Sequence, residues 1–371
     1  GEKVWDREKC AFVFDHYAPP PDVKSADNHR QMREFARKNQ LKYHFDTNCG
    51  VCHQVMPEAG LIRPGMIVVA TDSHTTTHGA FGAMGTGCGA TDMATILMTG
   101  ELWFRIPEII EVRLEGETKK GVYPKDVILA VLGKIRADGA VYKAIDFTGS
   151  YVEQLNVAGR MVICNMAVEM GAKTAYMQPN QAVLDYVDAR AAGPWEAETT
   201  DPGYRYEESY VFDVSSLEPQ LACPDSVENV HPLTEVTAEG PVKLDQGYIG
   251  SCTGGREDIA AAASILRGRH IPEYTRLVVV PAAREVMLSC MEKGYIQDLM
   301  EAGATITTPG CGACLGAHEG ILAPGEVCIS STNRNFPGRM GSTEARIYLA
   351  SPAAVAASIL NGRITDPRIY L

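Results

Sequence analysis

The feature that most constrains how this chain can fold is a set of short apolar segments that each end abruptly in polar residues. Residues 11–14 run into Asp15-His16, and residues 66–70 run into a Thr-Asp-Ser-His sequence. Residues 248–249 run in the same way into Gly-Ser-Cys. Short apolar runs bounded by polar residues and glycine are typical of buried strands. We therefore expect a strand in each segment, followed by a polar loop.

Helical patterns lie between these strands. A helix is expected after Pro124, where one apolar stripe comprises Val127, Ile128, Val131, Leu132 and Ile135. Another is expected to have Ser351 as its N-cap, Pro352 at its first position and Asn361-Gly362 at its end. The alternation of strand and helix predicts an α/β protein with largely parallel sheets. In such sheets ligands bind at the carboxyl ends of strands, where the polar loops lie.

Length and local composition indicate the domain organisation. A chain of 371 residues exceeds what one hydrophobic core usually fills. We expect three domains of comparable size, over residues 1–108, 109–235 and 236–371. Residues 196–225 are rich in acidic and aromatic residues and poor in periodicity. This stretch is therefore expected to be a long excursion across the surface.

Composition disfavours several classes of function. The net charge of −12 disfavours nucleic acid as a partner, because neutralising phosphates needs a basic face. An anionic substrate would instead need a local cationic pocket. The longest apolar stretches, such as residues 127–132 and 277–280, are too short to cross a bilayer, and no charged-then-apolar leader precedes Val4. We expect a soluble, cytoplasmic protein without a membrane partner.

The cysteines favour bound metal. Eleven are too few for a disulfide scaffold and odd in number, so most are expected to be reduced. Cys252 lies in a strand-to-helix turn that favours a thiolate, although a buried structural cysteine would also fit there. Cys311 and Cys314 form a C-x-x-C loop that suits a redox dithiol, zinc or an iron–sulfur cluster. Three thiolates would leave one iron of a cluster open as a Lewis acid, whereas electron-transfer clusters normally use four, so we expect catalysis.

Three weaker motifs have other interpretations. Cys49-Gly-Val-Cys-His53 matches c-type haem attachment, which belongs to exported proteins, and no export signal is visible. Residues 85–90 fit a loose dinucleotide fingerprint but do not directly follow their strand, so we interpret these glycines as packing residues. His74 and His78 are four residues apart, but the residues between them make a poor start for a zinc-binding helix.

Several phrases together carry a family resemblance. They are Thr71-Asp72-Ser73-His74-Thr75, Gly250-Ser251-Cys252-Thr253, Cys311-Gly312-Ala313-Cys314 and Asn333-Arg334-Asn335-Phe336-Pro337-Gly338-Arg339. In this order and at these separations they resemble the aconitase family over essentially the whole chain. Residues 100–105 and 331–335 resemble the large subunits of the two-chain 3-isopropylmalate dehydratases and homoaconitases, in their archaeal-type branch.

The resemblance implies a fold and a partner. The family has three α/β/α domains around a central iron–sulfur cluster and a mobile fourth domain, the swivel domain, which we expect this chain to lack. In two-chain members that domain is a separate small subunit, so we expect a heterodimer or heterotetramer in which the small subunit supplies a serine base. At its start, the chain is expected to lack the family's first few dozen residues, including a substrate-contacting glutamine segment.

The resemblance also implies a cofactor, namely one 4Fe-4S cluster with three cysteine ligands and one open iron. Cys252, Cys311 and Cys314 match its ligands. Asn165 and Asn333 match asparagines that hydrogen-bond to cluster sulfur and so tune the metal. The remaining eight cysteines are expected to be structural.

Acid–imidazole pairs and substrate contacts are implied in the same way. The matching pairs are Asp15 with His16, Asp72 with His53, and Glu169 with His74. In the first pair the imidazole would give a proton to the departing hydroxyl while the carboxylate keeps it charged and oriented. The matching substrate contacts are Ser73, Arg334 and Arg339. The arginines would supply the cationic pocket that an acidic protein needs for a carboxylate substrate.

The implied reaction is reversible dehydration and rehydration of a hydroxy di- or tricarboxylic acid. 3-Isopropylmalate is the first choice of substrate and homocitrate or homoaconitate the second, while dimethylmalate and methylmalate-type acids remain open. A different class is a non-catalytic zinc or thiol-redox protein that uses Cys49, Cys52, Cys311 and Cys314. That alternative gives no purpose to residues 72–74 and 333–339.

Overall fold

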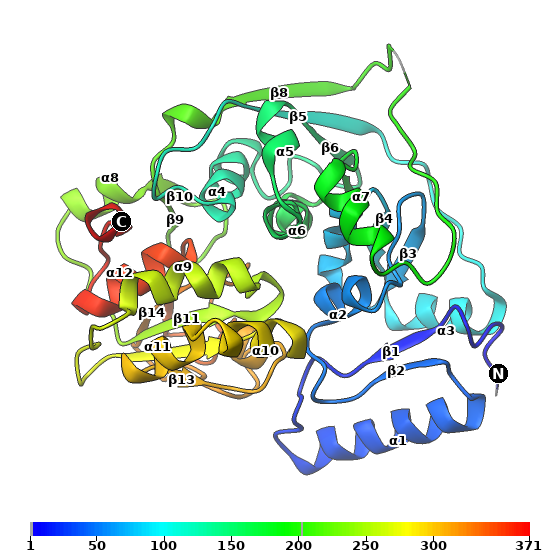
Figure 1. Cartoon of the computed structure of the whole chain (residues 1–371), viewed down its shortest axis with the longest axis horizontal. Coiled ribbons are helices and arrows are strands. Elements are labelled where there is room, and N and C mark those ends of the chain that lie inside the picture. Colours follow the sequence, from blue (N-terminus) through cyan, green and yellow to red (C-terminus); the bar gives the residue numbers. More distant parts are fainter. Residues whose placement is uncertain (1–2, 202) are drawn as a thin grey trace.

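The computed structural model describes residues 3–201 and 203–371. Within them the strands form a seven-stranded sheet, a four-stranded sheet and two two-stranded sheets. Figure 1 shows the two-stranded sheets at the right, the four-stranded sheet at the top and the seven-stranded sheet at the lower left. None of the helices in the described ranges is long and apolar enough to cross a membrane.

The amino-terminal region holds the two small sheets. Its elements are β1 (Ala11–Val13), α1 (Val23–Asn39), β2 (Tyr43–Phe45), α2 (Cys52–Glu58), β3 (Ile67–Ala70), η1 (Ser73–Phe81), β4 (Met84–Gly87) and α3 (Ala90–Thr99). β1 pairs in parallel with β2, and β3 pairs in parallel with β4. The strands expected over residues 11–14 and 66–70 are confirmed, and each leads into its polar loop.

The middle region is built on the four-stranded sheet, whose order is β7-β6-β5-β8. Its elements are β5 (Ile109–Glu115), α4 (Pro124–Ile135), β6 (Ala144–Thr148), α5 (Ser150–Gln154), α6 (Val157–Asn165), η2 (Met166–Met170), β7 (Thr174–Tyr176), α7 (Gln181–Asp188) and β8 (Glu208–Asp213). All pairs in this sheet are parallel. Figure 1 shows α4, α5 and α6 on the face of the sheet that is turned toward the centre of the molecule.

The carboxyl-terminal region is built on the seven-stranded sheet, whose order is β10-β9-β15-β14-β11-β12-β13. Its strands are β9 (Gln220–Ala222), β10 (Val230–Pro232), β11 (Gln246–Gly250), β12 (Arg276–Val280), β13 (Thr305–Ile306), β14 (Val327–Ser330) and β15 (Arg346–Leu349). Its α-helices are α8 (Leu233–Ala238), α9 (Arg256–Leu266), α10 (Arg284–Glu292), α11 (Tyr295–Glu301) and α12 (Pro352–Asn361). The 3-10 helices are η3 (Val214–Ser216), η4 (Ser251–Thr253), η5 (Gly312–Leu315) and η6 (Pro367–Tyr370).

The α/β class and the parallel sheets are confirmed, since only β9 and β10 pair antiparallel to their neighbours in the described sheets. The expected helices are confirmed as α4 and α12. Ile128 and Leu132 of the α4 stripe are 0% exposed, and each buried side chain of this size stabilises the fold by about 1.5–3 kcal/mol. Ser351 stands at the N-cap of α12 with extended backbone, but its side chain makes no capping hydrogen bond to the helix.

The prediction for residues 196–225 was wrong in part, because the stretch contains β8, η3 and β9. In β8, Tyr210 and Phe212 pack against the core while Val211 between them is 68% exposed. This two-residue alternation marks a strand with one buried face, and β8 lies at the edge of its sheet. β9 and β10 precede residue 235 yet belong to the seven-stranded sheet, and the division into three domains stays a prediction.

Candidate active site

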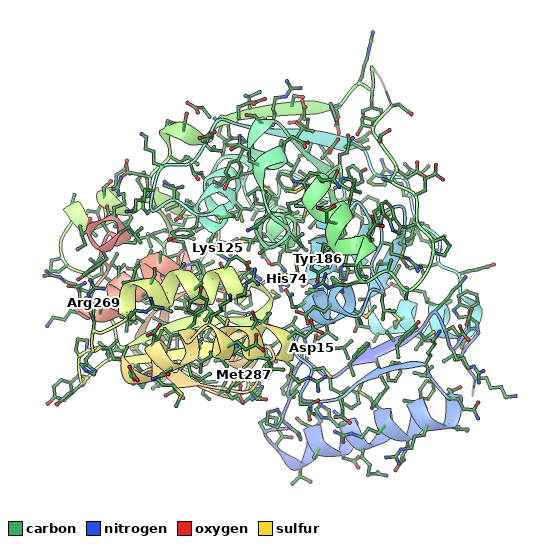
Figure 2. All side chains as sticks on the ribbon, viewed as in Figure 1. Asp15, His74, Lys125, Tyr186, Arg269 and Met287 are labelled. Atoms are coloured by element: carbon green, nitrogen blue, oxygen red, sulfur yellow. The ribbon has the colours of Figure 1, made fainter. Side chains whose placement is uncertain are left out.

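The polar loops expected at the strand ends converge on one cavity. It is lined by His16, Val51, His53, Asp72 and His74 of the amino-terminal region and by Ser251, Cys252, Cys311, Cys314, Leu315, Asn333 and Arg339 of the carboxyl-terminal region. Figure 2 shows Asp15, His74 and Lys125 near the centre of the molecule, where the regions meet. A cavity of about 2190 Å³ between β1, β3 and α3 also reaches Asp15, His16 and Asp72, so the site adjoins a wide opening.

The cysteine side chains come from two turns. β11 ends at Gly250, and Gly250 and the following Ser251 both have positive φ (151° and 66°), so a sharp turn directs Cys252 away from the strand. Ser331 holds the turn, because its hydroxyl accepts the Gly250 N–H at 3.1 Å and its carbonyl accepts the Thr253 hydroxyl at 2.8 Å. Burial raises the pKa of the Cys252 thiol to about 12. A buried thiol of this kind is protonated until a metal displaces the proton.

The second turn carries Cys311 and Cys314 around η5. The carbonyl of Cys311 accepts the buried Tyr248 hydroxyl at 2.9 Å, which ties the turn to β11. A Cβ on Gly312, whose φ is +52°, would lie 2.5 Å from that hydroxyl, so glycine permits the close approach. Burial raises the pKa of the Cys311 thiol to about 11.

The groups around the three sulfurs suit an anionic ligand. Asn333 Nδ2 donates to Cys252 Sγ at 3.0 Å, and Arg339 Nη2 lies 3.8 Å from Cys314 Sγ. Donors of this kind stabilise thiolates bound to metal. The thiols and their cationic or amide neighbours therefore fit an iron–sulfur cluster held by Cys252, Cys311 and Cys314.

Asn165 meets the site differently from Asn333. Its Nδ2 donates to Thr77 Oγ1 at 2.8 Å, which turns Oδ1 toward Cys252 Sγ at 3.7 Å. In this arrangement the Cys252 thiol donates to the amide oxygen. Asn165 is in place beside the sulfur, and its expected role as a donor to a cluster stays a prediction.

Among the described residues, one group of metal-type ligand atoms lies within 4.8 Å of one another, and it consists of Asp15, His16 and Cys311. Its carboxylate is already occupied by hydrogen bonds. Asp15 Oδ1 contacts His16 Nδ1 at 2.8 Å, and Oδ2 accepts the Cys52 backbone N–H at 2.9 Å. A zinc ion would have to break the contact with the imidazole, so this group is better described as an ion pair beside a cluster ligand.

The structure brings together all three expected acid–imidazole pairs. The contacts are Asp15 Oδ1 with His16 Nδ1, Asp72 Oδ1 with His53 Nε2, and Glu169 Oε1 with His74 Nε2, each at 2.8 Å. Asp72 connects the pairs, because its Oδ2 lies 3.4 Å from His16 Nε2 and its Oδ1 accepts the His74 backbone N–H at 2.7 Å. The first and last pairs therefore share one network.

The protonation of the pairs follows from their neighbours. The Cys311 sulfur, followed by Asp15, raises the pKa of His16 against the effect of burial. Burial alone would raise the pKa of Asp72, but the charges and hydrogen bonds of His53 and His74 outweigh it and hold that pKa far below its ordinary value. Burial would likewise lower the pKa of His74, yet Asp72 and Glu169 raise it. The surroundings thus favour the imidazolium form of His16 and of His74 beside their carboxylates.

The predicted substrate-binding residues lie at the same place. Arg334 donates from Nε to Glu169 Oε1 at 2.8 Å and from Nη2 to Ser73 Oγ at 3.2 Å. Arg339 keeps Nε buried, without a hydrogen-bond partner among the described residues. Arg339 therefore has a donor available for an anion that is added to the site.

The weaker motifs are explained by packing. His53 is engaged by Asp72 as described above, which agrees with a role other than haem attachment. A Cβ on Gly85 would lie 2.1 Å from Thr75 O, so this glycine lets β4 approach η1, as interpreted from the sequence. His78 is 2% exposed and packs edge-on against His53, with ring centroids 5.6 Å apart, rather than joining His74.

Lys125 was missed by the sequence analysis. Its Nζ donates to Thr332 O at 2.8 Å and to Asn333 Oδ1 at 3.1 Å. Lys125 stands four and seven residues before the buried Leu129 and Leu132, so it lies on the core face of α4. A lysine at such a position is a signal that could have been found by extending the apolar stripe back to the start of the helix.

Comparisons with known proteins give the family. The Aconitase family model (aconitate hydratase) matches residues 11–362. The 3-isopropylmalate dehydratase large subunit 1 of Methanopyrus kandleri is 51% identical, over 100% of this chain and 88% of that protein. A probable methanogen homoaconitase large subunit of Methanothermobacter thermautotrophicus is 50% identical, over 99% of this chain and 85% of that protein. The 3-isopropylmalate dehydratase large subunit of Hydrogenobaculum sp. is 45% identical, over 99% of this chain and 86% of that protein. With its α/β fold and a family match that spans nearly its whole length, this chain belongs to the aconitase family.

Proposed function

We propose that this chain is the cluster-carrying large subunit of a hydro-lyase, most closely a 3-isopropylmalate dehydratase that interconverts 2- and 3-isopropylmalate. The observation that carries the proposal is the convergence of three thiols and three acid–imidazole pairs on one cavity. Thiols alone would suit zinc or redox chemistry. Proton donors beside them are what the departure of a hydroxyl group requires.

In this proposal Cys252, Cys311 and Cys314 hold one 4Fe-4S cluster. When bound, the cluster supplies a Lewis acid at the iron that has no cysteine ligand. Asn333 supports the Cys252 sulfur by donating to it, and Arg339 places positive charge beside Cys314. These contacts hold the thiolates in position and offset their negative charge.

His16 is the proposed proton donor to the leaving hydroxyl group. Its side chain is 37% exposed, so the ring can reach a substrate, while Asp15 and Asp72 lie on its two nitrogens at 2.8 and 3.4 Å. Two carboxylates keep the ring charged and oriented. The pairs of Asp72 with His53 and of Glu169 with His74 hold the two other carboxylates of the site in place.

Arg334, Arg339 and Ser73 form the proposed carboxylate pocket. Arg334 donates to both Glu169 and Ser73, which holds its guanidinium beside the pair of Glu169 and His74. The buried, unpaired Nε of Arg339 offers a second donor. A guanidinium binds a carboxylate through two parallel hydrogen bonds, so this pocket suits a di- or tricarboxylic acid.

A small subunit is the proposed partner, in a heterodimer or heterotetramer. It would carry the swivel domain and the serine that removes the proton from the neighbouring carbon. The names of the relatives, which are large subunits, support such a partner. The nearly equal identity to a homoaconitase subunit makes homocitrate and homoaconitate the second choice of substrates. Activity of the assembled enzyme on isopropylmalate or on homoaconitate, tested side by side, distinguishes the two.

The proposal is tested by anaerobic iron and sulfide analysis with electron paramagnetic resonance, with and without added ferrous iron. The variant is Cys252→Ala, and the matched control is Cys290→Ala, a buried cysteine in α10. We expect a cluster that cycles between three and four irons in the wild type and the control and is lost in Cys252→Ala. Stoichiometric zinc, or a cluster indifferent to Cys252, would contradict the proposal.

A further inference from the structure

Lys125 is a buried cation with neutral partners. Its side chain is 2% exposed, and both acceptors of its ammonium, Thr332 O and Asn333 Oδ1, are uncharged. No ion pair to Lys125 occurs within 4.0 Å in the described ranges, 3–201 and 203–371. Burying an ammonium without a counter-ion is costly. An anion that the side chains within 4.0 Å do not supply would therefore stabilise the charged form of this lysine.

Neither the helix nor the core accounts for this lysine. Lys125 is the second residue of α4, where the helix dipole disfavours positive charge. It lies on the same face as Leu129 and Leu132, which are 0% exposed. An apolar residue would serve both the helix and the packing better.

The charges that favour the ammonium point toward the cysteine site. Burial lowers the pKa of Lys125 to about 8, and negative charge on Cys252, Asp258, Cys314 and Glu169, in that order, opposes the fall. Glu169 is already paired with His74 and Arg334. Burial raises the pKa of Asp258 to about 7, which removes much of its charge near neutral pH. Once a metal displaces their protons, the Cys252 and Cys314 sulfurs would supply the missing negative charge.

The hydrogen bonds give Lys125 a route to one of those sulfurs. An ammonium can only donate, so the Asn333 atom at 3.1 Å from it must be Oδ1. That fixes the amide orientation and turns Nδ2 toward Cys252 Sγ, at 3.0 Å. Without Lys125 the amide could rotate by half a turn and present its oxygen to the sulfur, which would repel a thiolate.

We propose that Lys125 is a positioning residue for the bound cluster, acting through the amide of Asn333 on the Cys252 sulfur. The cluster with its thiolates is in turn the counter-ion that the buried ammonium lacks. This inference rests on the proposed function, because it requires the cluster. It predicts that the lysine stabilises the loaded protein without being needed for folding.

The test compares Lys125→Met with Lys134→Met, an exposed lysine on the same helix. Both remove one positive charge from α4, but only the first faces the site. In the cluster-loaded full chain, Lys125→Met is expected to increase the rate of iron loss to a chelator about tenfold or more. Its equilibrium constant for cluster reduction is expected to fall about tenfold, which lowers the reduction potential by about 59 mV. Lys134→Met should match the wild type in both measurements.

The unfolding midpoint of the cluster-free protein tests whether Lys125 has a merely structural role. If Lys125 only supported the loop around Thr332, its replacement would lower the unfolding midpoint of the cluster-free chain. We expect that midpoint to stay close to the wild type, because methionine fills the space of the stem and removes the unpaired charge. A fall in this midpoint, with an unchanged potential and rate of iron loss, would overturn the inference.

Asn333→Ala completes the test. If the lysine acts through the amide, the double variant Lys125→Met/Asn333→Ala should lose iron no faster than the worse single variant. If the increases in the rate of iron loss of the two single variants multiplied fully in the double variant, the two residues would act independently. That result would overturn the inference that Lys125 acts through the amide of Asn333. A wild type that binds no cluster would overturn the proposed function as well, whereas a loaded Lys125→Met that behaves like the wild type would overturn this inference alone.

Discussion

Glu169 is the carboxylate on which two cations of the site depend, so its replacement tests the site without any cofactor. The Glu169 side chain is 7% exposed and contacts His74 Nε2 and Arg334 Nε, each at 2.8 Å. Glu169→Gln keeps the shape but removes the charge that faces both cations, which leaves His74 with Asp72 alone at 3.6 Å, and its amide nitrogen would face a donor. Removing one partner of a buried ion pair costs about 3–5 kcal/mol.

The expected thermal shift follows from the size of the chain. An unfolding entropy of about 2.1 cal/mol/K per residue gives about 0.8 kcal/mol/K for 371 residues that unfold together. Glu169→Gln should then lower the unfolding midpoint of the cluster-free protein by about 4–6 °C in calorimetry. Glu34→Gln, which breaks an exposed pair with Arg30, is the matched control and should cost less than about 1 kcal/mol.

The pH dependence gives an independent check. Burial alone would raise the pKa of Glu169, but the hydrogen bonds and charges of His74 and Arg334 outweigh it and lower that pKa. A carboxylate with a lowered pKa stabilises the fold above its unfolded value, 4.5, and this stability is lost as the pH falls through the folded pKa. The difference in free energy of unfolding between wild type and Glu169→Gln should therefore be largest at about pH 7 and shrink in acid. A difference in free energy of unfolding below about 1 kcal/mol at about pH 7, or one that is constant with pH, would refute the reasoning.

Three further changes follow from other parts of the structure. Burial raises the pKa of Asp126 from 3.8 to about 7, so the folded protein binds more protons there than the unfolded chain and wild-type stability falls across that window as the pH rises. Asp126→Asn should therefore gain stability relative to the wild type as the pH rises from about 4 to about 7 in denaturant titrations, and a constant difference would contradict this. Gly85→Ala would place Cβ 2.1 Å from Thr75 O and should cost about 3 kcal/mol, against at most about 1 kcal/mol for Gly89→Ala, measured by chemical unfolding. In the enzyme assembled with its small subunit, Arg339→Lys should raise KM about tenfold or more with a smaller change in kcat, since lysine cannot form the two parallel bonds, and an unchanged KM would remove Arg339 from the carboxylate pocket.

The sequence contained enough local information to place the strands that carry the site. β1, β3 and β11 are short and apolar and lead into polar residues, and each of these features is visible without tertiary contacts. β8 was missed because its alternation of Tyr210, Val211 and Phe212 lies within a stretch dominated by acidic residues. β9 was missed because it has three residues, too few for any period to show.

The candidate site was predictable where the motif is local and less so where it depends on folding. The C-x-x-C spacing of Cys311 and Cys314 indicates by itself that the two sulfurs act together. The pairing of Glu169 with His74 joins residues 95 positions apart, so only the family resemblance could propose it. Lys125 was missed because its partners, Thr332 and Asn333, lie more than 200 residues away and are neutral.

The contacts that form the site are also contacts between the regions of the fold. Glu169 of the middle region binds His74 of the amino-terminal region and Arg334 of the carboxyl-terminal region, while Lys125 reaches from α4 to the loop that holds Asn333. Correct docking of the regions is therefore needed to align the thiols with their donors. Because a ligand that binds only the docked form stabilises it, a bound cluster should strengthen the contacts between regions. Protection of backbone amides in η1 and η2 against hydrogen exchange should then rise when iron and sulfide are added, and unchanged protection would show that the regions dock independently of the cluster.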